Sequence, residues 1–409
     1  MTTHTYKSRI IIIGANFAGL TAASKIDKHH LVTVIDARAD FQWTPNIHEM
    51  LSDVKKQDYL SLPLTTLISK LGHHFIQQTV KSVNNELKTV SLNDGQTLDY
   101  DVLLIASGHS RTSYGITGAD KYAIGFRQAS DALAINNKIQ ASINSNTSTI
   151  INIIGGGFTG VEVLGELLRK YPKNTNIKLN IVESSSSILQ SLPSKLANDI
   201  IEQCNKLGVH FYFNKAIKEV KNASICFDDN STVQSDITIW TAGTKLPDYL
   251  LDLNANIVAN GLPVNRYLQA EGFDSIFVAG DSASYSSPLP KQASNAMDMG
   301  LHAAENINRF CKYKTMLPFT PKTKPILLSL GDINTYLIQK NLVLASPLLA
   351  AAKEAVYQLY MARLSSLLPI EQGLSGIAGR FSLSTEKLLL AEVLKARPKV
   401  LLGRSKVLY

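Results

Sequence analysis

The chain has 409 residues, of which 45% are apolar and 18% are charged, and its formal net charge is +8. This length predicts two or three domains, and the apolar fraction excludes a globally disordered chain. The three cysteines form no C-x-x-C pair, which excludes a disulfide framework and favours a reducing compartment. We find neither a signal-peptide pattern nor the roughly 18 apolar residues of a spanning helix, so we expect a cytoplasmic protein that does not bind nucleic acid.

The first predicted unit is a β-α-β repeat at the N-terminus. A run of β-branched residues at 9–13 predicts a strand, and the segment 20–26 predicts the helix that follows it. A second apolar run at 31–35 predicts another strand, which ends at Asp36. Strand, turn and helix in this order, within about thirty residues, are typical of a dinucleotide-binding unit.

The loop of this unit has the glycine pattern of a pyrophosphate site with one irregularity. Its residues are Gly14, Ala15, Asn16, Phe17, Ala18 and Gly19. The first glycine permits a tight turn, and the last permits close helix-to-strand packing. Asn16 replaces the usual middle glycine, but asparagine tolerates left-handed dihedrals, so we expect a weakened site. Asp36 can bond a ribose hydroxyl; the alternative interpretation is a tight turn with a surface aspartate.

A second unit with the same order begins near residue 149. A predicted strand at 149–154 leads into Gly155, Gly157 and Gly160, which complete the pattern, and a helix is expected to continue to Arg169. The next strand ends at Glu183, which takes the ribose-binding position. No arginine follows it to neutralise a 2′-phosphate, which favours NADH over NADPH, unless a basic residue from elsewhere in the fold reaches that phosphate.

Similar segments follow each unit. A hairpin over 88–98 precedes a buried strand at 102–105, and a hairpin over 225–233 precedes a buried strand at 237–240. These strands run into short turns, which contain Ala106, Ser107 and Gly108 in the first half and Ala242 and Gly243 in the second. A further strand at 275–279 ends at Gly280 and Asp281, and a helix is expected over 293–308.

These patterns predict an α/β fold with two Rossmann-like domains, the second inserted in the first. We expect one dinucleotide-binding domain to comprise residues 1–113 and 265–325, and the other to comprise 114–264. Residues 326–409 form a C-terminal region that we expect to be mostly helical.

Taken together, the motifs resemble those of the two-dinucleotide-domain flavoproteins, which include pyridine nucleotide-disulfide reductases, apoptosis-inducing-factor-like proteins and alternative NADH:quinone oxidoreductases. The resemblance covers residues 9 to about 310. It implies that the first loop binds FAD and the second binds NADH. It also implies that Gly280 and Asp281 form a second FAD motif, and that the two short turns contact FAD and NADH respectively.

The resemblance also separates branches of this superfamily. Disulfide reductases need a reactive cysteine pair beside the flavin, and the segment 41–48 contains none. Cys204, Cys226 and Cys311 do not match the placement in sulfide:quinone oxidoreductases, so we interpret them as ordinary buried residues. In contrast, the segment 157–167 resembles the corresponding helix of alternative NADH dehydrogenases and apoptosis-inducing-factor-like proteins.

Three residues are the catalytic candidates, each with an alternative. The resemblance implies that Glu162 lies by the nicotinamide and the flavin, although a first-turn glutamate favoured by the helix dipole is the simpler interpretation. Lys291 is suited to polarise the flavin or an acceptor carbonyl, or is a surface lysine. His48 is suited to donate a proton to a quinone-like acceptor, or is a structural hydrogen bonder. The histidines show no metal-binding spacing, so we expect no metal.

The electron acceptor is less well defined than the donor. We expect a quinone, but the glutamines that line the quinone site of alternative dehydrogenases are absent near Ser294 and Asp298. The alternatives are a soluble flavin-dependent reductase of a small metabolite or carrier protein, and an NADH-sensing interaction protein. The region 346–409 ends in a basic amphipathic stretch, which favours either contact with an anionic membrane surface or packing within the chain or a homodimer.

Overall fold

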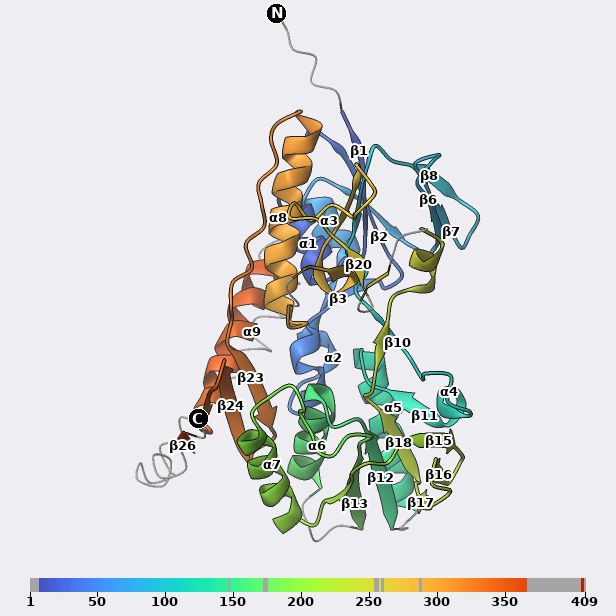
Figure 1. The fold of residues 1–409 in the computed structure, drawn as a ribbon, viewed down its shortest axis with the longest axis vertical. Coiled ribbons are helices and arrows are strands. Elements are labelled where there is room, and N and C mark those ends of the chain that lie inside the picture. Colours follow the sequence, from blue (N-terminus) through green and yellow to red (C-terminus); the bar gives the residue numbers. More distant parts are fainter. Residues whose placement is uncertain are drawn as a thin grey trace, which may run out of the picture.

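The computed structural model describes residues 7–145, 148–171, 176–253, 257–258, 261–286, 289–365 and 406–407. Two parallel five-stranded sheets lie one after the other along the long axis of the molecule (Figure 1). A C-terminal sheet and helix flank both of them on one side (Figure 1).

The first sheet contains the N-terminal strand at its centre. Its order is β21 (Ile276–Val278), β9 (Val102–Ile105), β1 (Arg9–Ile13), β2 (Leu31–Asp36) and β5 (His74–Gln77). The strand β1 is buried along Ile10–Ile13, as expected for a strand covered on both faces by helices. The covering helices are α1 (Phe17–Ala23), α3 (Leu64–Lys70) and α8 (Ala293–Cys311). Because β21 joins this sheet after the whole second unit, the insertion of one unit in the other is confirmed.

Short elements complete the first domain. They are β3 (Asp40–Gln42) with β4 (Ser61–Pro63), the 3-10 helix η1 (Thr44–Met50), α2 (Gln57–Leu60), the hairpin sheet β6 (Val80–Asn84), β7 (Thr89–Leu92) and β8 (Thr97–Asp99), β20 (Leu262–Pro263) with β22 (Ala283–Ser284), and η3 (Gly280–Ser282).

The second sheet repeats this arrangement around β12. Its order is β11 (Ala123–Gly125), β18 (Ile237–Trp240), β12 (Thr149–Ile154), β13 (Ile177–Val182) and β14 (His210–Tyr212). Its helices are α4 (Ala119–Tyr122), α5 (Ala129–Asn144), α6 (Phe158–Lys170) and α7 (Ser194–Lys206), and the side sheet consists of β15 (Ile217–Val220), β16 (Ser224–Phe227) and β17 (Thr232–Gln234). Two connections run between the domains as the antiparallel pair β10 (Ser110–Arg111) and β19 (Thr244–Lys245), and η2 (Asp248–Leu253) follows.

The C-terminal region differs from the mostly helical region that we expected. Residues 326–345 form an antiparallel sheet of β23 (Ile326–Leu330), β24 (Asn334–Gln339) and β25 (Leu342–Ala345), to which β26 (Lys406–Val407) pairs. The turns at Gly331 and Lys340 both adopt positive φ, which closes these hairpins. Helix α9 (Leu349–Ser365) follows. The basic stretch after residue 387 lies outside the described residues, apart from β26.

Candidate functional site

The first glycine loop is clamped between β1, β9 and α1. Gly14 has a φ of +98°, and a Cβ there would stand 2.4 Å from the Ala106 oxygen. A Cβ on Gly19 would stand 1.8 Å from the Gly14 oxygen, so both glycines are required by close backbone approach. Gly280 lies between the methyl groups of Ala18 and Ala296. The motifs assigned to FAD therefore meet at one edge of the first sheet.

Asp36 anchors the same loop from the end of β2. Its Oδ2 accepts a hydrogen bond of 2.8 Å from the Ala15 N–H. The Arg38 guanidinium donates to both of its oxygens at 3.1 and 3.2 Å. The Asp36 carboxylate is thus held in place by groups of the chain itself.

Asn16 does not use the left-handed tolerance that we invoked for it. It precedes α1 with φ −94° and ψ −147°, a conformation open to any residue. Its side-chain oxygen is buried without a hydrogen-bond partner among the described residues.

The second loop has the same close backbone contacts, but it is more open to solvent at its middle glycine. Gly155 has a φ of +100° beside Ala242, and a Cβ on Gly160 would stand 2.0 Å from the Gly155 oxygen. A Cβ on Gly157 would meet no atom within 4 Å, which leaves room for a phosphate to approach the start of α6. Gly243, at the adjoining turn, has a φ of +71° and faces the Tyr114 ring.

Glu183 holds the second loop as Asp36 holds the first. It accepts hydrogen bonds from the N–H groups of Gly156 at 2.7 Å and Ser185 at 2.9 Å. Burial alone would raise its pKa, but these hydrogen bonds outweigh burial and leave the pKa below its ordinary value. Glu183 is therefore an ionised acceptor at the end of β13.

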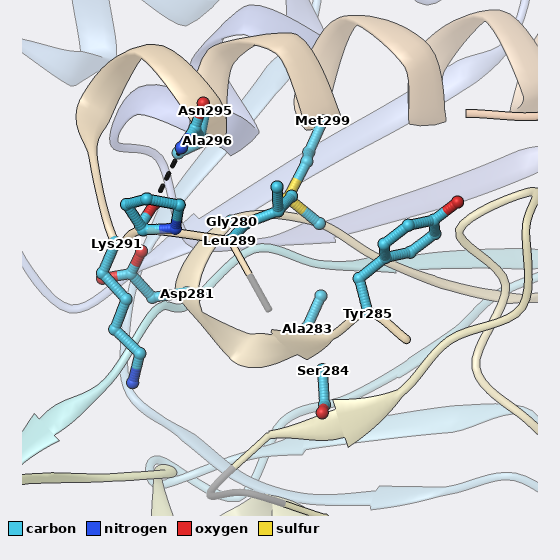
Figure 2. A pocket seen from close by; sticks show the side chains of 11 residues that line it. Gly280, Asp281, Ala283, Ser284, Tyr285, Leu289, Lys291, Asn295, Ala296 and Met299 are labelled. Atoms are coloured by element: carbon cyan, nitrogen blue, oxygen red, sulfur yellow. Dashed lines mark hydrogen bonds between the residues drawn. The ribbon is translucent and has the colours of Figure 1, made fainter. Parts of the chain in front are cut away.

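A cavity of about 130 Å³ lies between η3 and the start of α8 (Figure 2). Asp281 and Lys291 line it on one side, and Tyr285 and Met299 line it on the other (Figure 2). The Lys291 ammonium is 3.1 Å from His109 Nδ1. Burial lowers the pKa of Lys291, and the charge of Asp281 opposes this shift.

Arg127 belongs to the same region, although the sequence reasoning did not select it. Its side chain is exposed, but partial desolvation by the surrounding protein lowers the pKa of its guanidinium group. The negative charges of Asp281 and Asp131 act in the opposite direction and raise this pKa. Arg38 is a neighbouring cation. Two guanidinium groups beside the first loop could hold a pyrophosphate. Both lie just after strands of the two sheets, and that position is the signal that could have identified them.

Glu162 and His48 come together with a residue that we did not predict, Lys353. The Lys353 ammonium is 2.6 Å from Glu162 Oε1 and 3.3 Å from His48 Nε2, and His48 Nδ1 is 3.6 Å from Glu162 Oε2. These three residues, the junction cluster, come from α9, α6 and η1, where the two dinucleotide units and the C-terminal region meet. Their side chains are no more than 16% exposed.

The hydrogen-bonding pattern assigns the protons of the junction cluster. An ammonium only donates, so His48 Nε2 accepts from Lys353, and the histidine proton resides on Nδ1, facing Glu162.

Helix α6 begins at Phe158, which puts Glu162 in its second turn, so the helix-dipole interpretation does not account for this carboxylate. Lys291 is not part of this cluster and lies instead with His109.

Two further observations concern other kinds of site. Among the residues that the structure describes, no three histidine, cysteine or acidic side chains are grouped as metal ligands. Within the same residues, no helix is both long and apolar enough to cross a lipid bilayer.

The chain is similar to known proteins over most of its length. Type II NADH:quinone oxidoreductases of Staphylococcus saprophyticus and Staphylococcus haemolyticus are 23% and 24% identical, and the alignments cover 80% of this chain and 88% of each relative. The structure of NDH2 from Plasmodium falciparum in complex with NADH superposes with a TM-score of 0.79 at 18% identity, covering 92% of this chain and 98% of that one.

The sulfide:quinone oxidoreductase of Aquifex aeolicus superposes with a TM-score of 0.76 at 17% identity, covering 89% of this chain and 94% of that one. Similarity at this level shows a shared fold, and it confirms the predicted pair of Rossmann-like domains. The pyridine nucleotide-disulphide oxidoreductase family model matches residues 8–300. The chain therefore belongs to the pyridine nucleotide-disulphide oxidoreductase family, which confirms the expected oxidoreductase with FAD and NADH as its cofactors.

Proposed function

We propose that the chain takes hydride from NADH and delivers the electrons, through FAD, to a quinone. The observation that carries this proposal is the junction cluster of Glu162, His48 and Lys353, which lies where the FAD unit and the NADH unit meet. FAD, when bound, supplies the two-electron chemistry that connects a hydride donor to a second substrate.

The first loop and its neighbours would hold FAD. Gly14 and Gly19 let the backbone approach the pyrophosphate, with Arg38 and Arg127 as counterions. Asp281 and Lys291 line the cavity beyond it. The Lys291 ammonium is placed to polarise a carbonyl oxygen of a group bound in this cavity.

The second loop would hold NADH in an exchangeable manner. The ionised Glu183 accepts from ribose hydroxyl groups and repels a 2′-phosphate, which favours NADH. Gly157 leaves the loop open in front, so the dinucleotide can enter and leave. Alignment of the nicotinamide, for which Glu162 is the candidate, is the contribution expected from the protein.

The junction cluster would supply a proton to the acceptor. NADH brings one proton with its hydride, so reduction of a quinone to the quinol requires one further proton. The Lys353 ammonium would supply it by protonating His48 Nε2, while His48 Nδ1 releases its own proton on the opposite side of the ring. Glu162 bonds Lys353 and faces His48, so it can stabilise either group in its protonated form. The names of the staphylococcal relatives support a quinone as the acceptor.

A soluble reductase of a small metabolite or a carrier protein is the second candidate function. Where the alternative dehydrogenases have glutamines, Asp298 forms a 2.6 Å ion pair with Lys324, and Lys324 also donates to the Ser294 carbonyl. This arrangement offers charged groups in place of neutral amides at the start of α8, which favours a polar acceptor.

Anaerobic spectroscopy and acceptor kinetics test the proposal. The purified protein should be yellow, and excess NADH should bleach the flavin band without oxygen. Steady-state NADH oxidation should be faster with a menaquinone analogue than with oxygen or ferricyanide. Absence of flavin would reject the proposal, fast turnover with polar acceptors only would favour the second candidate, and bleaching without turnover would favour an NADH-sensing role.

We also propose that residues 346–409 contact the cytoplasmic membrane face, in the monomer or a homodimer. The exposed Val356 and Leu359 on α9 support an apolar contact. Sedimentation with anionic vesicles tests this directly, because the protein should pellet with the vesicles at low salt. Recovery of the protein in the supernatant as a dimer would indicate that this region mediates self-association instead.

A further inference from the structure

A second ion cluster, formed by Lys55, Glu354 and Glu49, is more deeply buried than the junction cluster. The Lys55 ammonium donates to both carboxylate oxygens of Glu354 at 3.0 and 2.9 Å. It also lies 3.8 Å from Glu49 Oε2 and 3.9 Å from the centre of the Tyr357 ring. The Lys55 side chain is 1% exposed, so this charge interacts with protein groups rather than with water.

The two clusters are adjacent along the chain at two points. Glu354 follows Lys353 on α9, and Glu49 follows His48 on η1. Lys55 therefore links the helix that carries one member of the junction cluster to the 3-10 helix that carries another.

Helix α9 carries apolar residues on more than one side. Tyr357, Met361 and Leu364 are buried at helical spacing, but Val356 and Leu359 are apolar as well and are 56% and 74% exposed. Apolar burial favours the observed rotation about the helix axis, but a neighbouring rotation would bury Val356 or Leu359 instead. Consecutive helical residues point about 100° apart, so a shift of one position would direct Glu354 or Ala352, instead of Lys353, at Glu162.

We propose that Lys55 is a positioning residue that sets the rotation of α9 and thereby keeps Lys353 within hydrogen-bond distance of Glu162 and His48. A buried ion pair adds little net stability over apolar residues of similar size, and its best-attested use is to select one register among several. The positioning role of Lys55 does not depend on the proposed function. The expected slowing of electron transfer to the acceptor does rest on it.

The test uses variants that separate positioning from folding. Lys55→Met alone leaves the buried Glu354 without its cation and is expected to lower the melting temperature. The double variant Lys55→Met with Glu354→Met removes the bidentate ion pair as a unit and leaves only Glu49, 3.8 Å away, without the Lys55 cation, so its melting temperature should be higher than that of Lys55→Met alone. Lys312→Met, which removes an ion pair with Asp27 far from α9, is the control.

A zero-length carbodiimide cross-link between Lys353 and Glu162 reports their distance without depending on activity. We expect mass spectrometry to detect this cross-link in the wild type and in the Lys312→Met control, and to find it lost in the double variant. In addition, reoxidation of the reduced flavin by menadione should be about 10²-fold slower in the double variant and lose its pH dependence, because the proton-bearing groups are misplaced.

The outcomes separate the two proposals. A double variant that folds and retains both the cross-link and the wild-type reoxidation profile overturns the positioning role. If NADH fails to reduce the wild-type flavin, the proposed function fails, but the cross-link comparison still decides the role of Lys55. If the double variant loses the cross-link while the reoxidation profile is unchanged, Lys55 positions α9 and the junction cluster is not the proton source.

Discussion

The two glycine loops share one pattern of backbone hydrogen bonds, but they differ in the side chains that pack over them. Each loop begins with a glycine N–H that donates to the strand after the loop's helix, at 2.7 Å from Gly14 to the Ile35 oxygen on β2 and at 2.9 Å from Gly155 to the Val182 oxygen on β13. Each is anchored by a carboxylate that accepts from the next N–H, at 2.8 Å for Asp36 and 2.7 Å for Glu183. The two turns therefore have the same hydrogen-bonded framework.

The difference lies in the layers outside the turns. Phe17, within the first loop, packs against Phe41, Trp43 and Tyr360, so α9 and the η1 segment close over it. In the second loop the equivalent residue, Phe158, is only partly buried, and Gly157 before it is exposed. We propose that the first loop retains its dinucleotide and that the second exchanges it, and the following changes test that proposal.

The largest effects should come from the last glycine of each loop. A Cβ on Gly19 or on Gly160 would stand within 2.0 Å of a backbone oxygen, so Gly19→Ala and Gly160→Ala each distort one loop. Gly19→Ala should yield protein without flavin, whereas Gly160→Ala should stay yellow but no longer be bleached by NADH. Flavin absorbance per protein and an anaerobic NADH titration measure both. Loss of flavin from Gly160→Ala would contradict the separate assignment of the loops.

The next effect concerns the junction cluster. His48→Asn replaces the imidazole with an amide that cannot transfer a proton, and it should slow reoxidation of the reduced flavin by a quinone analogue by about 10²-fold. Reduction by NADH should be unchanged, since His48 lies on the FAD side of the junction. Stopped-flow measurement of the two half-reactions separates them, with Glu202→Gln in a surface ion pair as control. Equal slowing of both half-reactions would argue for a structural histidine.

Local features of the sequence were sufficient to predict the loops and their strands. The expected strands at 9–13 and 149–154 coincide with β1 and β12, because β-branched runs that end in glycine have few alternatives. Helix α1 begins at Phe17, three residues before the segment that we expected, because the turn at Asn16 already directs its carbonyl to Leu20.

The junction cluster was beyond that reasoning because it depends on tertiary distance. Lys353 is 191 residues from its partner Glu162, and no local period relates them. The only available signal was a lysine and a glutamate within an apolar helix, where charged residues seldom occur without partners. The strands β23 to β25 were missed for a similar reason, since short apolar runs fit helix and strand equally well.

A smaller effect is expected at the ribose position of the second loop. Glu183→Gln removes the charge that repels a 2′-phosphate, and the preference for NADH over NADPH should fall by about tenfold, as for one charge-assisted hydrogen bond. Because its pKa is lowered, Glu183 stays ionised as the pH falls through the ordinary glutamate value of 4.5, so the preference should persist there. Values of kcat/KM for both nucleotides test this, and an unchanged ratio would exclude Glu183 from ribose recognition.

The smallest effect should come from Asn16, the one departure of the first loop from the glycine pattern. With φ at −94°, this position does not need glycine, so Asn16→Gly gains no relief of backbone strain. The change removes a buried oxygen that lacks a partner, a gain of about 1 kcal/mol, but it adds freedom to the unfolded chain at a cost of about 0.5–1 kcal/mol. The melting temperature should therefore stay within a few degrees of the wild type, and flavin should be retained. Thermal release of flavin, followed by its fluorescence, measures both quantities. A variant that loses flavin would show that the Asn16 side chain itself binds the cofactor. Retention would instead attribute the difference between the loops to the aromatic cover at Phe17 and not to the missing glycine.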